Sequence, residues 1–399
     1  MAPTSRSRRH RPRRPLAFGS ASLVAMALTV SIGSGPADAV DVSSVTESLP
    51  SSADMQGPGS LGSLAPGSNG DGDADTLPAP TVVAEELVVP WDIAFVNSDT
   101  ALVSQRDSGQ VIEVSGNGSK RVAGIIEDVH PEGETGLHGL AVHEGYLYAY
   151  YATSEDNRVD RFDITGEPGS LGLGHREEIV SGLPIGNIHN GGRISFGPDG
   201  KLYLAGGDFQ ELRDAIFTQD PYHPAGKILR YNPDGTIPGD NPWPQSPAYS
   251  MGHRNVQGLA WTDDGTMYAA EFGQDEWDEL NKISPGANYG WPTVEGKGGP
   301  AEFTDPVQQW RPSEASPSGM AYAGGKLYIA NLRGERIRTV DVSDDYRSET
   351  QFTGQFGRLR HVEVAPDGSL WVLTNNTDGR GVTRDGDDKI LRIELPTGN

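Results

Sequence analysis

The sequence predicts an all-β protein, a six-bladed β-propeller whose blades are four-stranded antiparallel sheets. Three observations lead to this prediction. Only 35% of the 399 residues are hydrophobic, while 52 glycines and 29 prolines make up a fifth of the chain, which is typical of turn-rich β proteins rather than helical bundles. A turn followed by an alternating apolar strand recurs six times. Successive turns lie roughly 40 to 65 residues apart, a spacing found in propeller blades.

The repeat has two strands that can be recognised in every unit. The turns lie at residues 97–99, 144–145, 198–200, 263–265, 324–325 and 366–368. The strands that follow them read TALVSQ, YLYAYY, KLYLAGG, TMYAAEF, KLYIANL and SLWVLTN. The trailing strands read QVIEVS, NRVDRFDI, KILRYN, DELNKIS, ERIRTVDV and KILRIEL. Because Asp-Gly before alternating apolar residues is a strong hairpin signal, each unit is expected to form one sheet with an inner and an outer strand.

Closure of the six sheets into a ring has a physical reason. Each small sheet has two apolar faces and two bare edges, and packing six sheets around an axis buries the faces and leaves only short edges. A β-sandwich is the alternative, but it does not explain a turn signature repeated six times. The loops at one end of such a ring surround a central depression, which is a natural ligand site.

The N-terminal region has a different composition. Residues 1–39 contain six arginines, then a short apolar run, then Ala37-Asp38-Ala39, which together are typical of a signal peptide cleaved near Ala39. A membrane anchor is the alternative, but the apolar run is short and interrupted. Residues 40–80 are rich in Ser, Gly, Pro and Asp and are expected to form a disordered leader. Residues 81–399 are expected to form the propeller domain of a secreted protein without stable membrane insertion.

Composition also excludes several classes of chemistry. The chain has no cysteine, so disulfides, thiolate metal sites, thiol nucleophiles and covalent haem attachment are excluded. Its formal net charge is −23, and removal of residues 1–39 makes it about five charges more negative, which favours solubility. Nucleic acid is not an expected partner, because its phosphates require neutralisation by Lys and Arg. The oligomeric state stays open.

Six segments carry polar residues that a structural repeat does not need. They are GETGLHGLA (133–141), HNGGRISFGPDGKLYLAGGD (189–208), GHRNVQGLAW (252–261), EFGQDEWDELN (271–281), ANLRGERI (330–337) and GRLRHVEVAPDG (357–368). In this order, and with NYGWP at 288–292, they resemble the soluble aldose sugar dehydrogenases of the glucose/sorbosone dehydrogenase family, which depend on pyrroloquinoline quinone (PQQ). The resemblance runs from about Val89 to Leu395.

The resemblance implies three catalytic residues. His189 matches the general base that takes the proton of the sugar's C1 hydroxyl, and imidazole suits this role because its pKa is ordinarily near neutral. Asp208, after the same hairpin, matches the carboxylate that orients the base. Arg254 matches a residue that stabilises charge on the quinone, and Asn255 matches a cofactor donor. Without the resemblance, a surface histidine at a turn is the preferred interpretation of His189. The alternative for Arg254 is an ion pair with a carboxylate between blades.

The resemblance also implies an anion-binding set. Arg333, Arg358 and Arg360 match basic residues that bind the three carboxylates of PQQ, a task for which the planar guanidinium is well suited. Arg358 and Arg360 are two residues apart, so on a strand both face the same way. Glu134 stands where the family commonly has a glutamine that contacts the cofactor, and a carboxylate there repels PQQ unless it is protonated or turned away. His138 and His361 are further departures.

Calcium is the second implied cofactor. Gly273 and Gln274, with Phe272, match a loop whose backbone carbonyls bind a Ca²⁺ ion that also contacts PQQ. Glu279 and the carbonyl of Tyr289 match ligands of a separate structural ion. Ca²⁺ prefers six to eight oxygen ligands. The spacing of the acidic residues in segment 271–281 is not that of an EF-hand. Without the resemblance, a solvated loop is therefore the default interpretation of this segment.

The leading hypothesis is therefore a secreted quinoprotein that oxidises the C1 hydroxyl of an aldose to a lactone. Because no haem can be attached covalently, the electrons are expected to pass to an external acceptor. Two alternatives stay open: a calcium-dependent lactonase-type hydrolase, and a non-catalytic propeller that binds sugar or protein. Propellers host all three functions, so the fold alone does not decide among them.

Overall fold

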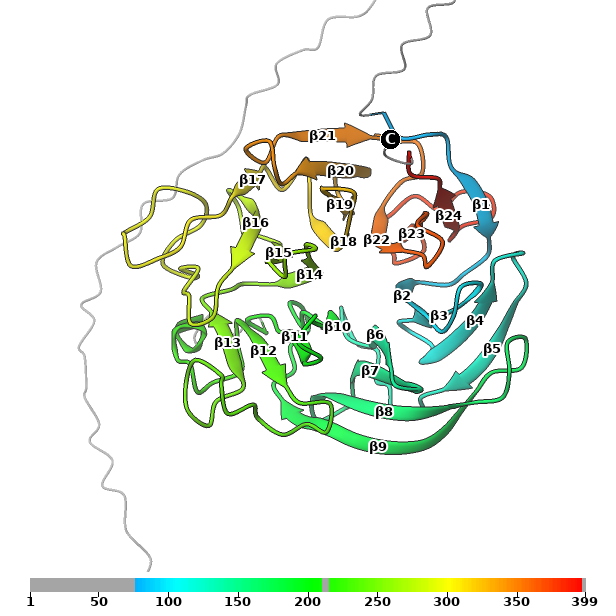
Figure 1. The fold of residues 1–399 in the computed structure, drawn as a ribbon, viewed down its shortest axis with the longest axis horizontal. Coiled ribbons are helices and arrows are strands. Elements are labelled where there is room, and N and C mark those ends of the chain that lie inside the picture. The colour runs from blue at the N-terminus through cyan, green and yellow to red at the C-terminus, as the bar shows by residue number, and fades with distance from the viewer. Residues whose placement is uncertain (1–75, 210–214, 397–399) are drawn as a thin grey trace, which may run out of the picture. The chain divides into compact units, whose positions relative to one another are not determined.

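The computed structural model describes residues 76–209 and 215–396. They form six four-stranded sheets placed as blades around a central axis (Figure 1). Neighbouring strands within each sheet are antiparallel, as in β2–β3 and β6–β7. The six-bladed β-propeller of four-stranded antiparallel blades is confirmed.

The strands of the first three blades, from the axis outward, are β2 (Pro90–Phe95), β3 (Thr100–Gln105), β4 (Gln110–Ser115) and β5 (Lys120–Ile125); β6 (Leu137–His143), β7 (Tyr146–Ala152), β8 (Asn157–Thr165) and β9 (Gly172–Leu183); β10 (Ile194–Phe196), β11 (Leu202–Ala205), β12 (Lys227–Tyr231) and β13 (Ala248–Met251). A 3₁₀ helix, η1 (Ala215–Gln219), lies between β11 and β12.

The strands of the last three blades are β14 (Val256–Trp261), β15 (Met267–Glu271), β16 (Asp278–Ile283) and β17 (Gln308–Trp310); β18 (Pro317–Ala323), β19 (Lys326–Asn331), β20 (Arg336–Asp341) and β21 (Ser348–Gln351); β22 (Leu359–Val364), β23 (Leu370–Thr374), β24 (Ile390–Ile393) and β1 (Thr81–Ala84). The strand after each predicted turn is the second strand of its blade. The strand before the turn is the one nearest the axis (Figure 1).

The first described strand closes the ring. β1 pairs with β24 as the outermost strand of the last blade, with Thr81 opposite Arg392 and Val82 opposite Leu391. This pairing joins the two ends of the propeller by main-chain hydrogen bonds, so separating the terminal blades requires breaking a sheet. Nothing in the repeat predicts it, because a strand that pairs across the whole domain carries no local signature.

Six hydrophobic clusters lie between neighbouring blades. One joins the β6–β9 and β10–β13 blades through Tyr148 and Leu204, and another joins the last and first blades through Trp371 and Val103. The other four fill the remaining interfaces in the same way. Each fully buried large apolar side chain contributes roughly 1.5–3 kcal/mol, so the interfaces hold the ring together and fix the loops at its ends.

The predicted signal peptide and most of the predicted leader lie outside the described residues. In the parts of the chain that the structure covers, no helix is both long enough and apolar enough to cross a membrane.

Candidate active site

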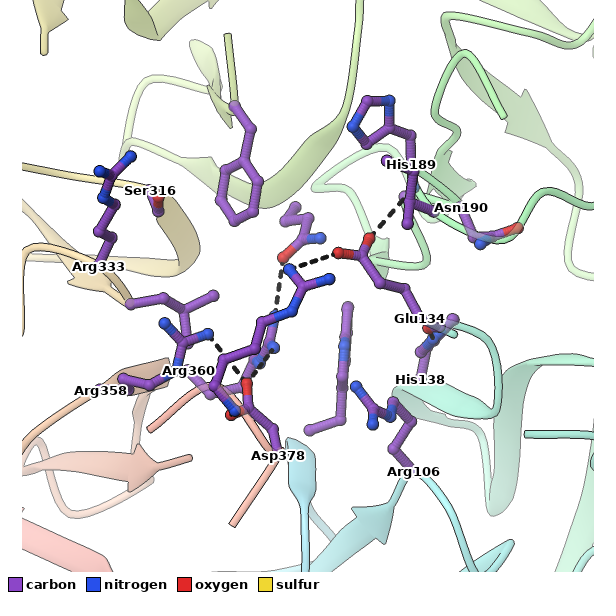
Figure 2. Close-up of a pocket in the computed structure, with 17 residues that line it drawn as sticks. Arg106, Glu134, His138, His189, Asn190, Ser316, Arg333, Arg358, Arg360 and Asp378 are labelled. Atoms are coloured by element: carbon purple, nitrogen blue, oxygen red, sulfur yellow. Dashed lines mark hydrogen bonds and ion pairs between the residues drawn. The ribbon is translucent and has the colours of Figure 1, made fainter. Parts of the chain in front are cut away.

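The polar segments meet at one end of the propeller because of how hairpins are built. In an antiparallel pair, the residue before the first strand and the residue after the second strand lie at the same end. His189 comes shortly before β10 and Asp208 shortly after β11, while Arg358 comes directly before β22 and Asp378 follows β23. The blades repeat the same hairpin, so these residues lie at one end of the ring. His189, Arg358 and Asp378 line one opening there (Figure 2).

This opening holds a cavity of about 330 Å³. Five arginines and two carboxylates are among the residues that line it; they are Arg106, Arg333, Arg358, Arg360, Arg380, Glu134 and Asp378. With neutral histidines the lining therefore carries three more positive than negative charges, in a chain whose formal net charge is −23. Such a concentration of arginine favours a ligand with several negative charges.

His189 and Asp208 form a buried pair at the edge of the cavity. Nδ1 of His189 lies 2.8 Å from Oδ1 of Asp208, and both residues are buried. Since the carboxylate oxygen accepts the hydrogen bond, Nδ1 carries the proton and Nε2 of the neutral ring is free of one. His189 has a φ of 59°, and it lines the cavity. The pair predicted from the sequence is brought together.

Arg358 and Arg360 face a shared carboxylate. Nη2 of Arg358 lies 2.9 Å from Oδ2 of Asp378, and Nη2 of Arg360 lies 3.9 Å from the same oxygen. Nη1 of Arg360 donates to Oε1 of Gln257 at 2.9 Å. Burial lowers the pKa of Arg360 to about 9, so the group still carries its charge at neutral pH. An anion in the cavity meets guanidinium groups whose positions are already fixed.

Three further arginines complete the lining. Arg333 is exposed and lines the cavity, as the sequence predicts. Arg106, directly after β3, and Arg380, between β23 and β24, were not predicted. Arg106 is largely buried and donates from Nε to Asp107 at 2.6 Å. No sequence motif marks either residue, and only the hairpin geometry places them at the opening.

The carboxylate of Glu134 lies in the cavity and is paired there with an arginine. Its Oε1 lies 2.7 Å from Nη1 of Arg380. Its Oε2 accepts a hydrogen bond from the backbone N–H of His189 at 3.2 Å, which is dashed in Figure 2. The carboxylate is therefore neutralised by Arg380 and tied to the loop of the candidate base. This ion pair accounts for an acidic residue in an anion-binding cavity.

Arg254 and Asn255 lie behind the lining and are not part of it. Nη1 of Arg254 donates to the carbonyl of Phe272 at 3.2 Å and to that of Gly273. Asn255 is fully buried and accepts from the backbone N–H of Gly191 at 3.1 Å. Phe272 and Gly191 themselves line the cavity, so Arg254 and Asn255 support its wall.

The other three histidines of the polar segments are buried, and of these His138 lines the cavity. His253 is bonded on both nitrogens, by Glu271 and Ser250, each at 2.8 Å. Burial lowers the pKa of His138 to about 3, and its Nε2 bonds the carbonyl of Glu134 at 2.8 Å. His361 lies 3.1 Å from Asp92, beside a separate cavity. None of the three is placed as a second base.

The predicted calcium ligands lie in two places, the loop 272–274 and the buried residues Glu279 and Tyr289. The Phe272 and Gly273 carbonyls already accept from Arg254, and the backbone N–H of Gln274 donates to Glu295 at 2.6 Å. Glu279 and Tyr289 are buried; burial and the neighbouring Glu271 raise the pKa of Glu279 to about 8. Among the described residues, no group of three or more His, Asp or Glu is arranged to hold a metal ion.

The fold and the site define a β-propeller with an arginine-lined axial cavity beside a buried histidine–aspartate pair. The chain belongs to the glucose/sorbosone dehydrogenase family, whose sequence profile matches residues 87–390. It is 28% identical to the aldose sugar dehydrogenase YliI of Escherichia coli, over 75% of this chain and 90% of that protein.

Two solved structures are similar to it throughout the propeller. The PQQ-bound aldose sugar dehydrogenase from Streptomyces coelicolor is 45% identical, with a TM-score of 0.76, covering 79% of this chain and 96% of that one. An oxidoreductase from Thermus thermophilus, described as a possible glucose dehydrogenase, is 38% identical, with a TM-score of 0.72, covering 79% of this chain and 99% of that one.

Proposed function

We propose that the protein is a PQQ-dependent dehydrogenase that oxidises the C1 hydroxyl of an aldose to a lactone. The observation that carries the proposal is the lining of the cavity, five arginines against two carboxylates, directly beside the His189–Asp208 pair. PQQ is a tricarboxylate, so its charge balances the positive excess of the cavity. The family membership and the PQQ-bound relative support the same assignment.

Unpaired donors in and behind the lining fit an anionic, oxygen-rich cofactor. Among the described residues, Nε of Arg358, Nε of Arg254 and Nδ2 of Asn255 are buried without a hydrogen-bond partner. A buried donor without an acceptor costs roughly 1–3 kcal/mol. Arg358 lines the cavity, so a ligand that supplies an oxygen acceptor to its Nε removes that cost. In this arrangement Arg358 and Arg360 would hold carboxylates of PQQ.

His189 acts as the general base in this proposal. When bound, PQQ accepts the hydride that leaves C1 of the sugar. Nε2 of His189 takes the proton of the C1 hydroxyl, and Asp208 on Nδ1 stabilises the imidazolium that forms. The positive charge of Arg254, behind the wall, favours build-up of negative charge in the cavity.

Calcium binding is proposed at Glu279. Glu271 and Glu279 are neighbouring buried carboxylates, and Oδ1 of Asn281 is buried without a partner among the described residues. A divalent cation neutralises the pair and adds a bond to the free amide oxygen. At the Phe272 and Gly273 carbonyls, by contrast, Ca²⁺ binds only if Arg254 turns away.

The electrons are proposed to pass to an external acceptor.

The alternative function, a calcium-dependent lactonase, is not favoured. A calcium-dependent hydrolase needs carboxylates and asparagines grouped at the axis to hold its ion. Here the axial opening is lined by arginines, and its two carboxylates, Glu134 and Asp378, are both paired with guanidinium groups.

Reconstitution tests the proposal. Apo-protein is mixed with PQQ, Ca²⁺, an aldose and a redox dye, and dye reduction is expected only when PQQ and the aldose are both present. His189→Asn is expected to abolish it; asparagine tolerates the positive φ of this position. His143→Asn, at a histidine stacked on Phe196, is the matched control. If saturating PQQ changes neither the absorption spectrum nor the melting temperature, the proposal is wrong.

A further inference from the structure

We propose that Trp291 is the positioning residue for the candidate base, acting through Asp208. The inference rests on the proposed function, in which His189 takes the substrate proton. Nε1 of Trp291 donates to Oδ2 of Asp208 at 3.0 Å, while the other oxygen, Oδ1, bonds His189 at 2.8 Å. The carboxylate is thus held from both sides.

The hydrogen bond from Trp291 restricts the rotation of the Asp208 carboxylate. A carboxylate turns about its Cβ–Cγ bond, and when one oxygen is bonded the direction of the other is set. Trp291 and Asp208 are both buried, so water does not replace the indole N–H easily, and a hydrogen bond to a charged group contributes about 1.5–3 kcal/mol. The bond from Trp291 therefore aims Oδ1 at the imidazole.

Trp291 is itself held firmly. Its carbonyl accepts from Oγ1 of Thr218 at 2.6 Å and from Nε2 of Gln219 at 2.7 Å, and its backbone N–H donates to the carbonyl of Gly252 at 2.9 Å. The guanidinium carbon of Arg254 lies 5.4 Å from the centroid of its ring. These contacts join the loop before β14, helix η1 and the candidate base into one assembly.

Through Asp208, Trp291 therefore determines which nitrogen of the His189 imidazole carries the proton. With Oδ1 in place, Nδ1 carries the ring proton and Nε2 keeps the lone pair that a general base needs. Without the indole N–H the carboxylate gains rotational freedom, and the tautomer with the proton on Nε2 becomes populated. That tautomer accepts no proton at Nε2.

The first test uses wild-type apo-protein and needs no cofactor. In a ¹H–¹⁵N spectrum, the indole proton of Trp291 is expected to resonate downfield and to exchange slowly. The matched reference is Trp371, which is also buried but whose Nε1 has no acceptor among the described residues. If the two indole protons have the same shift, or that of Trp291 exchanges rapidly, the proposal is overturned.

The second test uses variants. Trp291→Phe keeps an aromatic ring and removes the donor; the control is Trp310→Phe, at a buried tryptophan with Arg338 4.6 Å from its ring. In apo-protein, the ¹⁵N shifts of the His189 ring are expected to move toward a mixture of tautomers in Trp291→Phe only. In reconstituted protein, kcat is expected to fall about tenfold or more with KM for the sugar changed less than about twofold.

The two tests separate the possible failures. Unchanged ring shifts and unchanged kcat in a folded Trp291→Phe protein overturn the positioning role. If the wild-type protein shows no PQQ-dependent turnover at all, the proposed function fails instead, while the spectra of the apo-protein still decide whether Trp291 orients Asp208 and His189. A fall in kcat of the same size in Trp310→Phe also contradicts the proposal, because it marks a general loss of packing.

Discussion

Nδ1 of His189 and Oδ1 of Asp208 are 2.8 Å apart, although the two residues are separated by the whole β10–β11 hairpin. They meet because one precedes and the other follows the paired strands, at the end of the hairpin that faces the cavity. The interval of 19 residues between them is thus the length of a hairpin and its flanking loops. The same relationship places the arginines of other blades at this opening.

Asp208→Asn is expected to lower kcat by about 100-fold or more, because an amide can donate to Nδ1 and so favour the wrong tautomer. The kcat of the variant is measured by steady-state dye reduction with reconstituted protein. Asp367→Asn, at a carboxylate in the turn at the other end of the β22–β23 hairpin, serves as the control and should retain activity. Equal activities of Asp208→Asn and wild type would show that the pair is structural only.

Arg360→Gln is expected to weaken PQQ binding about tenfold or more, since a charge-assisted hydrogen bond contributes roughly 1.5–3 kcal/mol. Quenching of tryptophan fluorescence during titration of apo-protein with PQQ gives the dissociation constant. Arg392→Gln, on β24 and paired with Asp367 and Glu394, should bind normally. A uniform loss of affinity in both variants would count against a specific role.

Glu134→Gln is expected to tighten PQQ binding by about three- to tenfold at low salt, because the change removes a negative charge from the cavity and frees Arg380. The gain should shrink as salt is added, since charge effects near a surface are screened. Titrations at two ionic strengths check this. Unchanged or weaker affinity at low salt would mean that the carboxylate does not oppose the ligand.

Glu279 gives the calcium-free protein a pH dependence. Its pKa is raised to about 8 in the folded state from an ordinary value near 4.5, so the folded protein holds a proton that the unfolded chain releases. This stabilisation is complete below pH 4.5 and is lost as pH rises through 8, by up to about 1.4 kcal/mol per pH unit.

Glu279→Gln should make the dependence of unfolding free energy on pH less steep, measured by urea unfolding with a chelator present; Glu363, whose pKa burial also raises to about 8, keeps part of the slope. The control is Glu394→Gln, at an exposed carboxylate, which should keep the slope of the wild type. Added Ca²⁺ should restore stability at pH 8 in the wild-type protein more than in Glu279→Gln. A wild-type stability that rises between pH 5 and 8 would contradict the assignment.

The blades were predictable because each is specified locally, by a turn and two strands that lie close together in sequence. The six turns, three of which contain Asp-Gly, placed all six hairpins correctly. They did not reveal which strand is nearest the axis, nor that β1 completes the last blade, because pairing between Thr81 and Arg392 depends on ring closure rather than on local sequence.

The site was predictable where residues stand in distinctive motifs, as His189 and Arg360 do. Arg106 and Arg380 stand in no recognisable pattern, and they reach the cavity only because their loops lie at the same end of the ring. Trp291 lies in a segment already singled out, NYGWP, yet its bond to Asp208 joins residues from two blades and cannot be inferred from spacing.

In the proposed reaction a hydride leaves C1 of an aldose while His189 takes the hydroxyl proton. The most direct measurement mixes PQQ-loaded protein with an aldose deuterated at C1, without an external acceptor, in a stopped-flow instrument with product analysis. We predict one lactone formed per cofactor, a rate slower than with the protiated sugar by a primary isotope effect, and no reaction in His189→Asn. Lactone formation that is insensitive to deuterium at C1, or that persists in His189→Asn, would contradict the account.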